Sequence, residues 1–388
     1  MKVLITTDWY KPAVNGVVTS VMGLSEQLRH RGHQVKILTL SETFRSYEED
    51  DVIYMGSFGI GCIYPQARIK VPLSGKYFEE LAEWGPDIIH SQCEFSTFAL
   101  ARKLALKLGV PIVHTWHTIY EDYTHYLFLK GSFGKDIVRR MTRHISAQVD
   151  LIIAPSGKTQ ESLERAGTRC PVEVIPSGIN IEKYGRYRTS GWRYRLRRQL
   201  GIHPDQTVLL YVGRLAKEKN IQELLRFQKA VSRMDTVLLI VGDGPYMTEL
   251  REETRSLELE DRVIFTGMIS PEQVGRYYQA GDLFVNGSVS ETQGLTYAEA
   301  LASGIPLLCR KDPCLDGVLY SGRNGWSYEN QETFVRIVEK WCRLRAVEKE
   351  AFRRMAAQSA AGFSDAIFAG KVEEIYEYER EQKHWKAG

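Results

Sequence analysis

The chain has 388 residues, of which 43% are hydrophobic and 26% charged, which is typical of a globular protein long enough for two domains. Its net charge of +3 is too small to indicate nucleic-acid binding by itself, and its six scattered cysteines lack a C-x-x-C pair, which favours reduced thiols. The first apolar run ends at Asp8, and no stretch reaches the ~18 apolar residues of a membrane span. The sequence therefore predicts neither a signal peptide nor a transmembrane helix, and a cytoplasmic location.

Short apolar strands alternate with helical patterns through the first half of the chain. The predicted strands cover residues 2–7, 35–40, 87–90, 110–114, 150–154 and 172–175, and the predicted helices cover 17–31, 76–84, 96–108, 132–148 and 157–166. This alternation predicts a doubly wound parallel sheet. The first loop lacks the G-x-G-x-x-G of dinucleotide sites, which argues against a dehydrogenase. Gly16, at the start of the first helix, fits either an amide that contacts phosphate or a plain tight turn.

A second series of the same kind fills the other half. Its predicted strands cover residues 207–212, 236–241, 262–265, 282–285 and 306–308, and three helices follow at 331–343, 347–360 and 365–382. Residues 184–198, rich in Arg and Tyr, separate the two series. We therefore predict Rossmann-like domains at 1–183 and 184–365. Two such halves facing each other imply a ligand cleft at the carboxyl ends of their strands.

Residues 286–306 form a loop that passes into a short helix at Leu295. Glu291 lies on the loop and Glu299 about one turn into the helix, so they can bind different parts of one elongated ligand. Gly294 between them has no Cβ and allows a ligand to approach closely, while the free amides and dipole of the helix start suit a phosphate. A nucleotide sugar fits this pattern, with its ribose at Glu299 and its sugar hydroxyls at Glu291. An ordinary loop and helix with solvated carboxylates remains the alternative.

Two further loops follow strands at the same predicted edge. Arg214 and Lys219 come directly after strand 207–212, where α/β sheets bind ligands. Arg can bind phosphate in a bidentate way and Lys adds a compact charge, although solvated loop charges are the alternative. Gly242 and Gly244 belong to a second glycine loop, which is placed to flank a base or ribose.

These motifs carry a resemblance to a known family. In chain order, Gly213-Arg214…Lys219-Asn220, Gly242-Asp243-Gly244-Pro245 and Glu291-x7-Glu299 resemble the retaining glycosyltransferases of family four, which have the GT-B fold. Residues 175–179 extend the resemblance across the interdomain passage. It is closer still to bacterial 1,2-diacylglycerol 3-glucosyltransferases through residues 117–123, 290–297 and 314–317. In contrast to the commoner Gly-Gly of the family, the first loop has Asn15-Gly16.

The resemblance implies a role for each matching residue. Arg214 and Lys219 would bind the diphosphate, Glu291 the hydroxyls of the donor sugar, and His117 the donor sugar near its reacting carbon. The other implied donor-binding residues are Gly16, Gly242, Gly244, Thr292, Gln293, Gly294, Leu295, Thr296 and Glu299. The resemblance also implies that residues 366–388 pack back on the first domain, as a C-terminal helix.

We expect no metal ion in the active site and no other cofactor. No Asp-x-Asp motif occurs in the chain, so Arg214 and Lys219 would supply the positive charge that a metal supplies elsewhere. His114, His117, Glu121 and His125 also suggest a metal site, but His114 ends a predicted strand while the others lie in a turn rich in Tyr. A zinc site requires closed, supported ligands, which this pattern does not predict.

The predicted helix 132–148 combines basic and apolar residues. Its basic residues are Lys135, Arg139, Arg140 and Arg143, and the apolar run Leu127-Phe128-Leu129 precedes it. Such a combination suits an anionic membrane surface. The alternative is a core-packed helix with a solvated basic face.

We therefore predict an enzyme that transfers a hexose, with retention, from UDP-glucose to the free hydroxyl of diacylglycerol at the inner face of the cell membrane. The motifs contain no obvious protein nucleophile, which favours a same-face mechanism in which the leaving diphosphate takes the acceptor's proton. The alternatives are a mannosyl- or glucosyltransferase acting on phosphatidylinositol or a soluble glycan, and a non-catalytic subunit that binds nucleotide sugars. The choice of hexose and base stays open.

Overall fold

A computed structural model describes residues 1–59, 68–71, 75–123, 132–188 and 191–387. The chain forms two compact units, Met1–Gly178 with Asp365–Gly388, and Ile179–Ser364. The division falls at Gly178, whereas the predicted boundary at residue 183 lies inside a short helix of the second unit. Each unit is built around its own parallel sheet.

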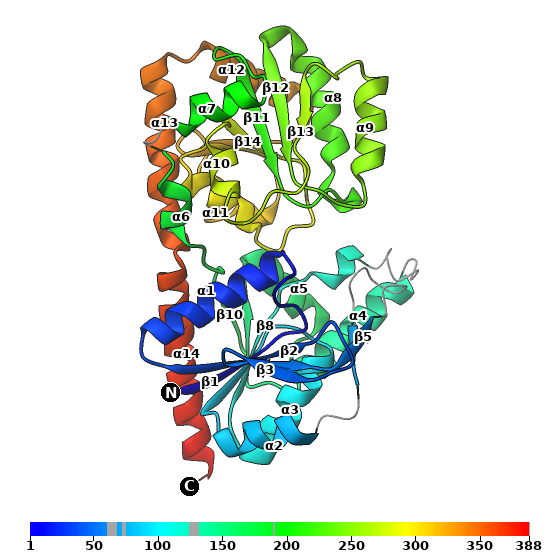
Figure 1. The fold of residues 1–388 in the computed structure, drawn as a ribbon, viewed down its shortest axis with the longest axis vertical. Coiled ribbons are helices and arrows are strands. Elements are labelled where there is room, and N and C mark those ends of the chain that lie inside the picture. The colour runs from blue at the N-terminus through cyan, green and yellow to red at the C-terminus, as the bar shows by residue number, and fades with distance from the viewer. Residues whose placement is uncertain (60–67, 72–74, 124–131, 189–190, 388) are drawn as a thin grey trace. The chain divides into compact units, whose positions relative to one another are not determined.

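The first unit contains an eight-stranded sheet of order β10-β9-β8-β7-β1-β2-β4-β3 (Figure 1). Neighbouring strands are parallel except β3 and β4, and β5 and β6 form a separate antiparallel pair. The strands are β1 (Lys2–Thr6), β2 (Gln34–Leu40), β3 (Tyr47–Glu49), β4 (Val52–Met55), β5 (Ser57–Gly59), β6 (Arg68–Lys70), β7 (Ile88–Ser91), β8 (Ile112–Thr115), β9 (Leu151–Ala154) and β10 (Val172–Val174).

Helices cover this sheet, and the last of them comes from the C-terminus. They are α1 (Gly16–His30), α2 (Gly75–Trp84), α3 (Ser96–Leu108), the 3-10 turn η1 (Tyr120–Tyr123), α4 (Ser132–Ser146), α5 (Gly157–Ala166) and α14 (Asp365–Ala387). Helix α1 begins where the Asn15 side chain accepts a hydrogen bond from the Val18 amide at 2.9 Å. Helix α14 packs against α1 (Figure 1), and Glu373 of α14 bonds His33 at 2.7 Å. The predicted return of the C-terminal helix is confirmed.

The second unit has a fully parallel sheet of order β13-β12-β11-β14-β15-β16. Its strands are β11 (Thr207–Val212), β12 (Thr236–Val241), β13 (Val263–Phe265), β14 (Leu283–Asn286), β15 (Leu307–Arg310) and β16 (Gly325–Tyr328). Its helices are α6 (Ile181–Gly185), α7 (Trp192–Gln199), α8 (Ile221–Val231), α9 (Met247–Ser256), α10 (Val274–Tyr278), α11 (Leu295–Ala302), α12 (Gln331–Arg343) and α13 (Ala346–Ser359). Its 3-10 turns are η2 (Lys217–Lys219), η3 (Ser232–Met234), η4 (Pro313–Leu315) and η5 (Ala360–Phe363).

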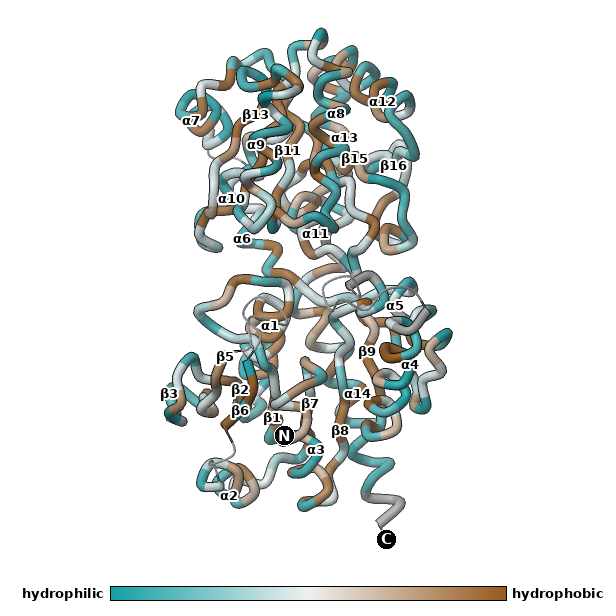
Figure 2. Tube along the Cα trace, turned by 90° about the vertical axis from the view of Figure 1, so that its right-hand side faces the viewer, coloured by the Kyte–Doolittle hydropathy of each residue, from teal (hydrophilic) through white to brown (hydrophobic). Residues whose placement is uncertain are grey.

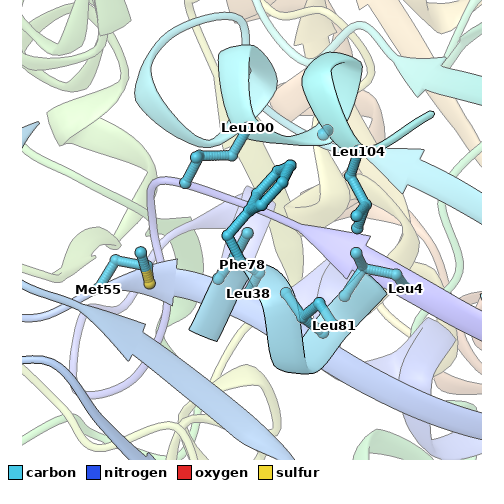
Figure 3. A pocket seen from close by; sticks show the side chains of 8 residues that line it. Leu4, Leu38, Met55, Phe78, Leu81, Leu100 and Leu104 are labelled. Atoms are coloured by element: carbon cyan, nitrogen blue, oxygen red, sulfur yellow. The ribbon is translucent and has the colours of Figure 1, made fainter. Parts of the chain in front are cut away.

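The central strands of each sheet are buried on both faces, as parallel sheets require. All residues of β11 and β12 are buried, and Figure 2 shows apolar residues concentrated along the strands and polar ones on the surrounding helices. A small cavity between the first sheet and α2–α3 has a wholly apolar lining that includes Leu4, Phe78 and Leu100 (Figure 3). It offers no polar group to orient a nucleotide sugar, so we interpret it as a packing defect.

The sequence analysis missed five strands, β3–β6 and β16. Strands β3, β5, β6 and β16 are short and contain polar residues or glycine, so no apolar run marks them in the sequence. One signal was present, because Asp50 and Asp51 join β3 to β4 with positive φ angles of 48° and 62°. Asp is among the residues that tolerate such angles in hairpin turns.

The Arg/Tyr-rich stretch that separates the two sequence series contributes some buried side chains to the second unit. Arg193 and Arg197 of α7 each donate to Asp282 at 2.5 Å, and Arg353 of α13 donates to it at 3.1 Å. Burial alone would raise the pKa of Asp282, but the three guanidinium groups and the Val208 amide hold it well below its usual range. The carboxylate therefore stays charged and ties α7 and α13 to the start of β14.

Candidate active site

Lys219 and Glu291 lie together at the carboxyl edge of the second sheet. Lys219 Nζ donates to Glu291 Oε1 at 2.7 Å, and both side chains are mostly buried, with 18% and 14% of their surface exposed. They meet because Lys219 follows β11 and Glu291 follows β14, and these two strands are neighbours in the sheet. The pair places a cation and a carboxylate side by side where α/β sheets bind ligands.

The loops that carry this pair are joined by hydrogen bonds. Asn220, in the left-handed conformation with φ 51°, donates from Nδ2 to the Gly287 carbonyl at 3.2 Å. Ser290 Oγ donates to the Glu218 carbonyl, also at 3.2 Å. Asn220 and Ser290 are the chain neighbours of Lys219 and Glu291. The two hydrogen bonds therefore fix the two loop backbones relative to each other.

The glycines of the next loop are required by close backbone packing. A Cβ on Gly242 would lie 2.0 Å from the Gly213 carbonyl oxygen, and one on Gly244 would lie 2.2 Å from the Leu215 carbonyl oxygen. The Leu215 amide also donates to Asp243 O at 2.9 Å, which joins the loops after β11 and β12. Arg214 is exposed on the first of these loops. The predicted contact of Gly242 and Gly244 with the donor stays a prediction.

Gly294 immediately precedes helix α11 with φ 72°, a conformation that favours glycine. A Cβ there would lie 2.4 Å from Cε2 of Tyr297, so the tyrosine ring also excludes a side chain. Having no side chain, Gly294 cannot cap the amides of the first helical turn, which suits the predicted phosphate site. The predicted neighbours lie on the loop, Thr292 and the buried Gln293, and in the first turn of α11, Leu295 and Thr296.

Glu299 lies on the second turn of α11 and is held by two buried tyrosines. Tyr184 donates to Oε1 and Tyr278 donates to Oε2, each at 2.7 Å. The tyrosines come from α6 and α10, distant in sequence from Glu299. The sequence analysis predicted Glu299 as a ligand-binding residue but found neither partner.

His117 belongs to the first unit and lies just beyond β8. Its Nε2 bonds Gln92 Oε1 at 2.7 Å, and Gln92 Nε2 bonds His90 Nε2 at 3.1 Å. Nδ1 of the buried His90 bonds the hydroxyl of Tyr376 on α14 at 2.5 Å. Burial lowers the pKa of His117 to about 4, against the opposing effect of Glu94, and His114 adds to the fall. His117 is therefore neutral near pH 7.

The sequence analysis missed Gln92 and the buried His90. Both lie at the end of β7, the neighbour of β8 in the sheet. A polar run directly after an apolar strand was the available signal, as it was for Lys219. Gly16, the other predicted donor-binding residue of this unit, is exposed at the start of α1.

We expect Gln92→Glu to make the activity pH-dependent. Wild-type His117 is neutral above about pH 5, so its protonation contributes no loss of kcat between about pH 6 and 8. A carboxylate at position 92 would face His117 and His90 and raise the pKa of both. The variant should then lose kcat as the pH falls through that range. Gln199→Glu, at an exposed position of α7, is the matched control. Identical pH profiles for wild type and Gln92→Glu would contradict the role of this contact.

The basic residues of α4 are exposed, but they are not equivalent. Lys135, Arg139 and Arg140 are exposed, whereas Arg143 donates from Nε to the Ala166 carbonyl at the end of α5 at 2.9 Å. Val138 and Ile145 are buried, as expected for the inner side of an amphipathic helix. The predicted apolar run at residues 127–129 lies outside the described residues.

Neither a metal cluster nor a membrane-spanning helix is found in the described ranges. Within them, no group of three or more His, Cys, Asp or Glu side chains is arranged to hold a metal ion. None of the helices in the same ranges is both long and apolar enough to cross a bilayer. His114 and Glu121 of the suggested metal set are described, and His125 lies outside these ranges.

Comparisons with known proteins identify the relatives of this chain. The family model described as Glycosyltransferase Family 4 matches residues 14–183, and that of Glycosyl transferases group 1 matches residues 193–360. Alpha-monoglucosyldiacylglycerol synthase from Streptococcus pneumoniae is 37% identical over 323 residues, covering 82% of this chain and 73% of that protein. The protein of the same name from Acholeplasma laidlawii is 33% identical over 350 residues, covering 87% of each.

A solved structure shows the same fold. The structure of Anabaena HepE in complex with UDP and glucose matches 97% of this chain and 100% of its own with a TM-score of 0.77. At 19% identity this likeness establishes the fold alone. Together with the two relatives and the two matched families, it shows that the chain belongs to glycosyltransferase family 4 and is a retaining, nucleotide-sugar-dependent glycosyltransferase with the GT-B fold.

Proposed function

We propose that this enzyme transfers glucose from UDP-glucose to diacylglycerol and so makes a monoglucosyl-diacylglycerol membrane lipid. The names of the two relatives, which are 37% and 33% identical, support a glycolipid product. The observation that carries the donor half of the proposal is the Lys219–Glu291 pair at 2.7 Å, with Arg214 on the loop that leads to Lys219. A cation for the diphosphate and a carboxylate for the sugar hydroxyls are what a nucleotide-sugar site needs.

The proposed reaction proceeds on one face of the sugar. The bond between the anomeric carbon and the diphosphate oxygen breaks, and the acceptor oxygen bonds to the same face of that carbon. The acceptor's proton passes to the leaving diphosphate. Arg214 and Lys219 stabilise the negative charge that develops on the diphosphate, and Glu291 orients the sugar. The family resemblance implies a role for His117, which is neutral, in binding the donor sugar.

Product analysis tests this function directly. The enzyme would be incubated with an equimolar mixture of UDP-glucose, UDP-galactose and GDP-mannose, with diacylglycerol in mixed micelles, and the lipid product identified by mass spectrometry and by the anomeric configuration of its sugar. Because glucose and galactose have equal mass, each donor is also supplied alone and its UDP or GDP release measured. We expect an α-glucosyl lipid and UDP release that depends on diacylglycerol. Transfer to phosphatidylinositol or to a soluble glycan in preference to diacylglycerol would contradict the proposal.

We further propose that α4 binds the anionic lipids at the inner face of the cell membrane and so docks the enzyme there. Each basic residue near an anionic surface contributes roughly 1 kcal/mol, an effect that fades within a Debye length. Reversing Lys135, Arg139 and Arg140 to Glu should therefore weaken vesicle binding by roughly 100-fold or more. Arg143 is left unchanged because it bonds the end of α5.

Vesicle co-sedimentation at increasing anionic lipid and salt measures this effect. The matched control reverses Arg336, Lys340 and Arg343, three exposed basic residues on α12. We expect the control to bind vesicles like wild type, and both variants to keep their activity on a short-chain micellar acceptor. Unchanged vesicle binding by the α4 variant would mean that α4 is an ordinary solvated helix.

A further inference from the structure

Both oxygens of the Glu299 carboxylate, in the proposed donor site, accept hydrogen bonds from tyrosine side chains. Tyr184 and Tyr278 donate to its two oxygens separately, at 2.7 Å each, and their rings meet edge to face with centroids 5.8 Å apart. Tyr184 is 4% exposed and Tyr278 is fully buried, whereas Glu299 keeps part of its surface exposed. The carboxylate is thus fixed from its buried side by phenols from two other helices.

This arrangement leaves each oxygen of Glu299 able to accept another hydrogen bond. An ionised carboxylate has about four acceptor positions, of which the phenols occupy one on each oxygen. A vicinal diol presents two hydroxyl donors with a spacing that suits the two oxygens of a carboxylate. The burial of both phenols and the negative charge of Glu299 raise their pKa values, so they remain protonated donors.

We propose that Tyr184 and Tyr278 are positioning residues that hold the Glu299 carboxylate in the orientation that binds the ribose diol of the nucleotide-sugar donor. The inference rests on the proposed donor site and extends it to two residues of α6 and α10. Without a phenol, the Glu299 side chain would become ordered only when the ribose binds. Because that ordering costs free energy, each ribose hydroxyl would contribute less to the binding free energy. The tyrosines therefore act on affinity for the nucleoside rather than on the transfer step.

The test compares UDP with 2′-deoxy-UDP by calorimetry, which requires neither the sugar nor the acceptor. Wild type should bind UDP roughly 10- to 100-fold more tightly, the value of a hydrogen bond to a charged group. In Tyr184→Phe and in Tyr278→Phe this ratio should fall at least about threefold, and in the double variant it should approach one. With UDP-glucose, KM should rise while kcat changes little.

Tyr297→Phe is the matched control. Tyr297 is fully buried in the same helix as Glu299, and its hydroxyl has no hydrogen-bond partner within the described part of the chain. This variant should keep the wild-type ratio. Thermal unfolding shows whether each variant is folded. If one of Tyr184→Phe and Tyr278→Phe does not fold, the other carries the test.

The possible results separate the inference from the proposed function. A tyrosine variant that binds both nucleotides more weakly but keeps the wild-type ratio would show a merely structural role and overturn the inference, as would unchanged binding. A wild-type ratio near one would also overturn it, because the 2′-hydroxyl would then not be bound. Transfer to another acceptor would overturn the proposed function and leave this result standing.

Discussion

Replacing Asp282 by alanine is expected to lower the free energy of unfolding by about 3–5 kcal/mol, the largest stability effect that we predict for a single substitution. The substitution would leave Arg193, Arg197 and Arg353 without their shared counter-ion, and Arg197 is itself 3% exposed. Urea unfolding followed by circular dichroism measures the change. Glu329→Ala, which breaks an exposed ion pair with Lys311, is the control and should unfold like wild type.

The same carboxylate should make stability depend on pH. The pKa of Asp282 is held below its usual value in the folded protein, so the unfolded chain binds the proton more readily as the pH falls. The contribution of Asp282 to the free energy of unfolding is therefore complete above the ordinary Asp pKa of about 3.9, and it is lost progressively at lower pH. Asp282→Asn should flatten that part of the stability profile. An unfolding midpoint within error of wild type for Asp282→Ala would show that the three arginines are satisfied without it.

Glu291→Gln is expected to lower kcat by roughly 10- to 100-fold while the fold stays intact. A carboxylate that accepts from a donor-sugar hydroxyl makes a charge-assisted bond worth about 1.5–3 kcal/mol, and its loss in the transition state reduces the rate by that factor. The amide oxygen of Gln can still accept from Lys219, so the loop should not move. Steady-state UDP release measures the effect, and turnover near the wild-type value would remove Glu291 from the site.

Lys219→Ala should lower kcat to a similar extent and also raise KM for the donor, because Lys219 is proposed to contact the diphosphate in the ground state. Lys229→Ala, at an exposed position of α8, is the control for loss of a positive charge. The double variant Lys219→Ala/Glu291→Gln should lose less than the product of the two single effects, since the residues are in contact. Effects that multiply would mean that the two residues act independently.

Two elements show how far the sequence by itself determined this protein. Strands such as β11 and β12 were predicted at their observed residues, because a parallel sheet buried on both faces requires unbroken apolar runs. Lys219 and Glu291 were predicted as site residues because they follow β11 and β14, and ligands bind at the carboxyl edge of such a sheet. An apolar run and the residues that directly follow it are neighbours in the chain, so both can be recognised from the sequence.

The tertiary structure alone decided which distant side chains support these residues. Tyr184 and Tyr278 reach Glu299 from two other helices, and Arg193 reaches Asp282 from a stretch that had no apolar pattern. Gly294 was predicted to make room for a ligand, yet its positive φ and the ring of Tyr297 already exclude a side chain. The hydrogen bonds to Glu299 and Asp282 depend on the packing of helices that are far apart in sequence, and no periodicity within one segment indicates them.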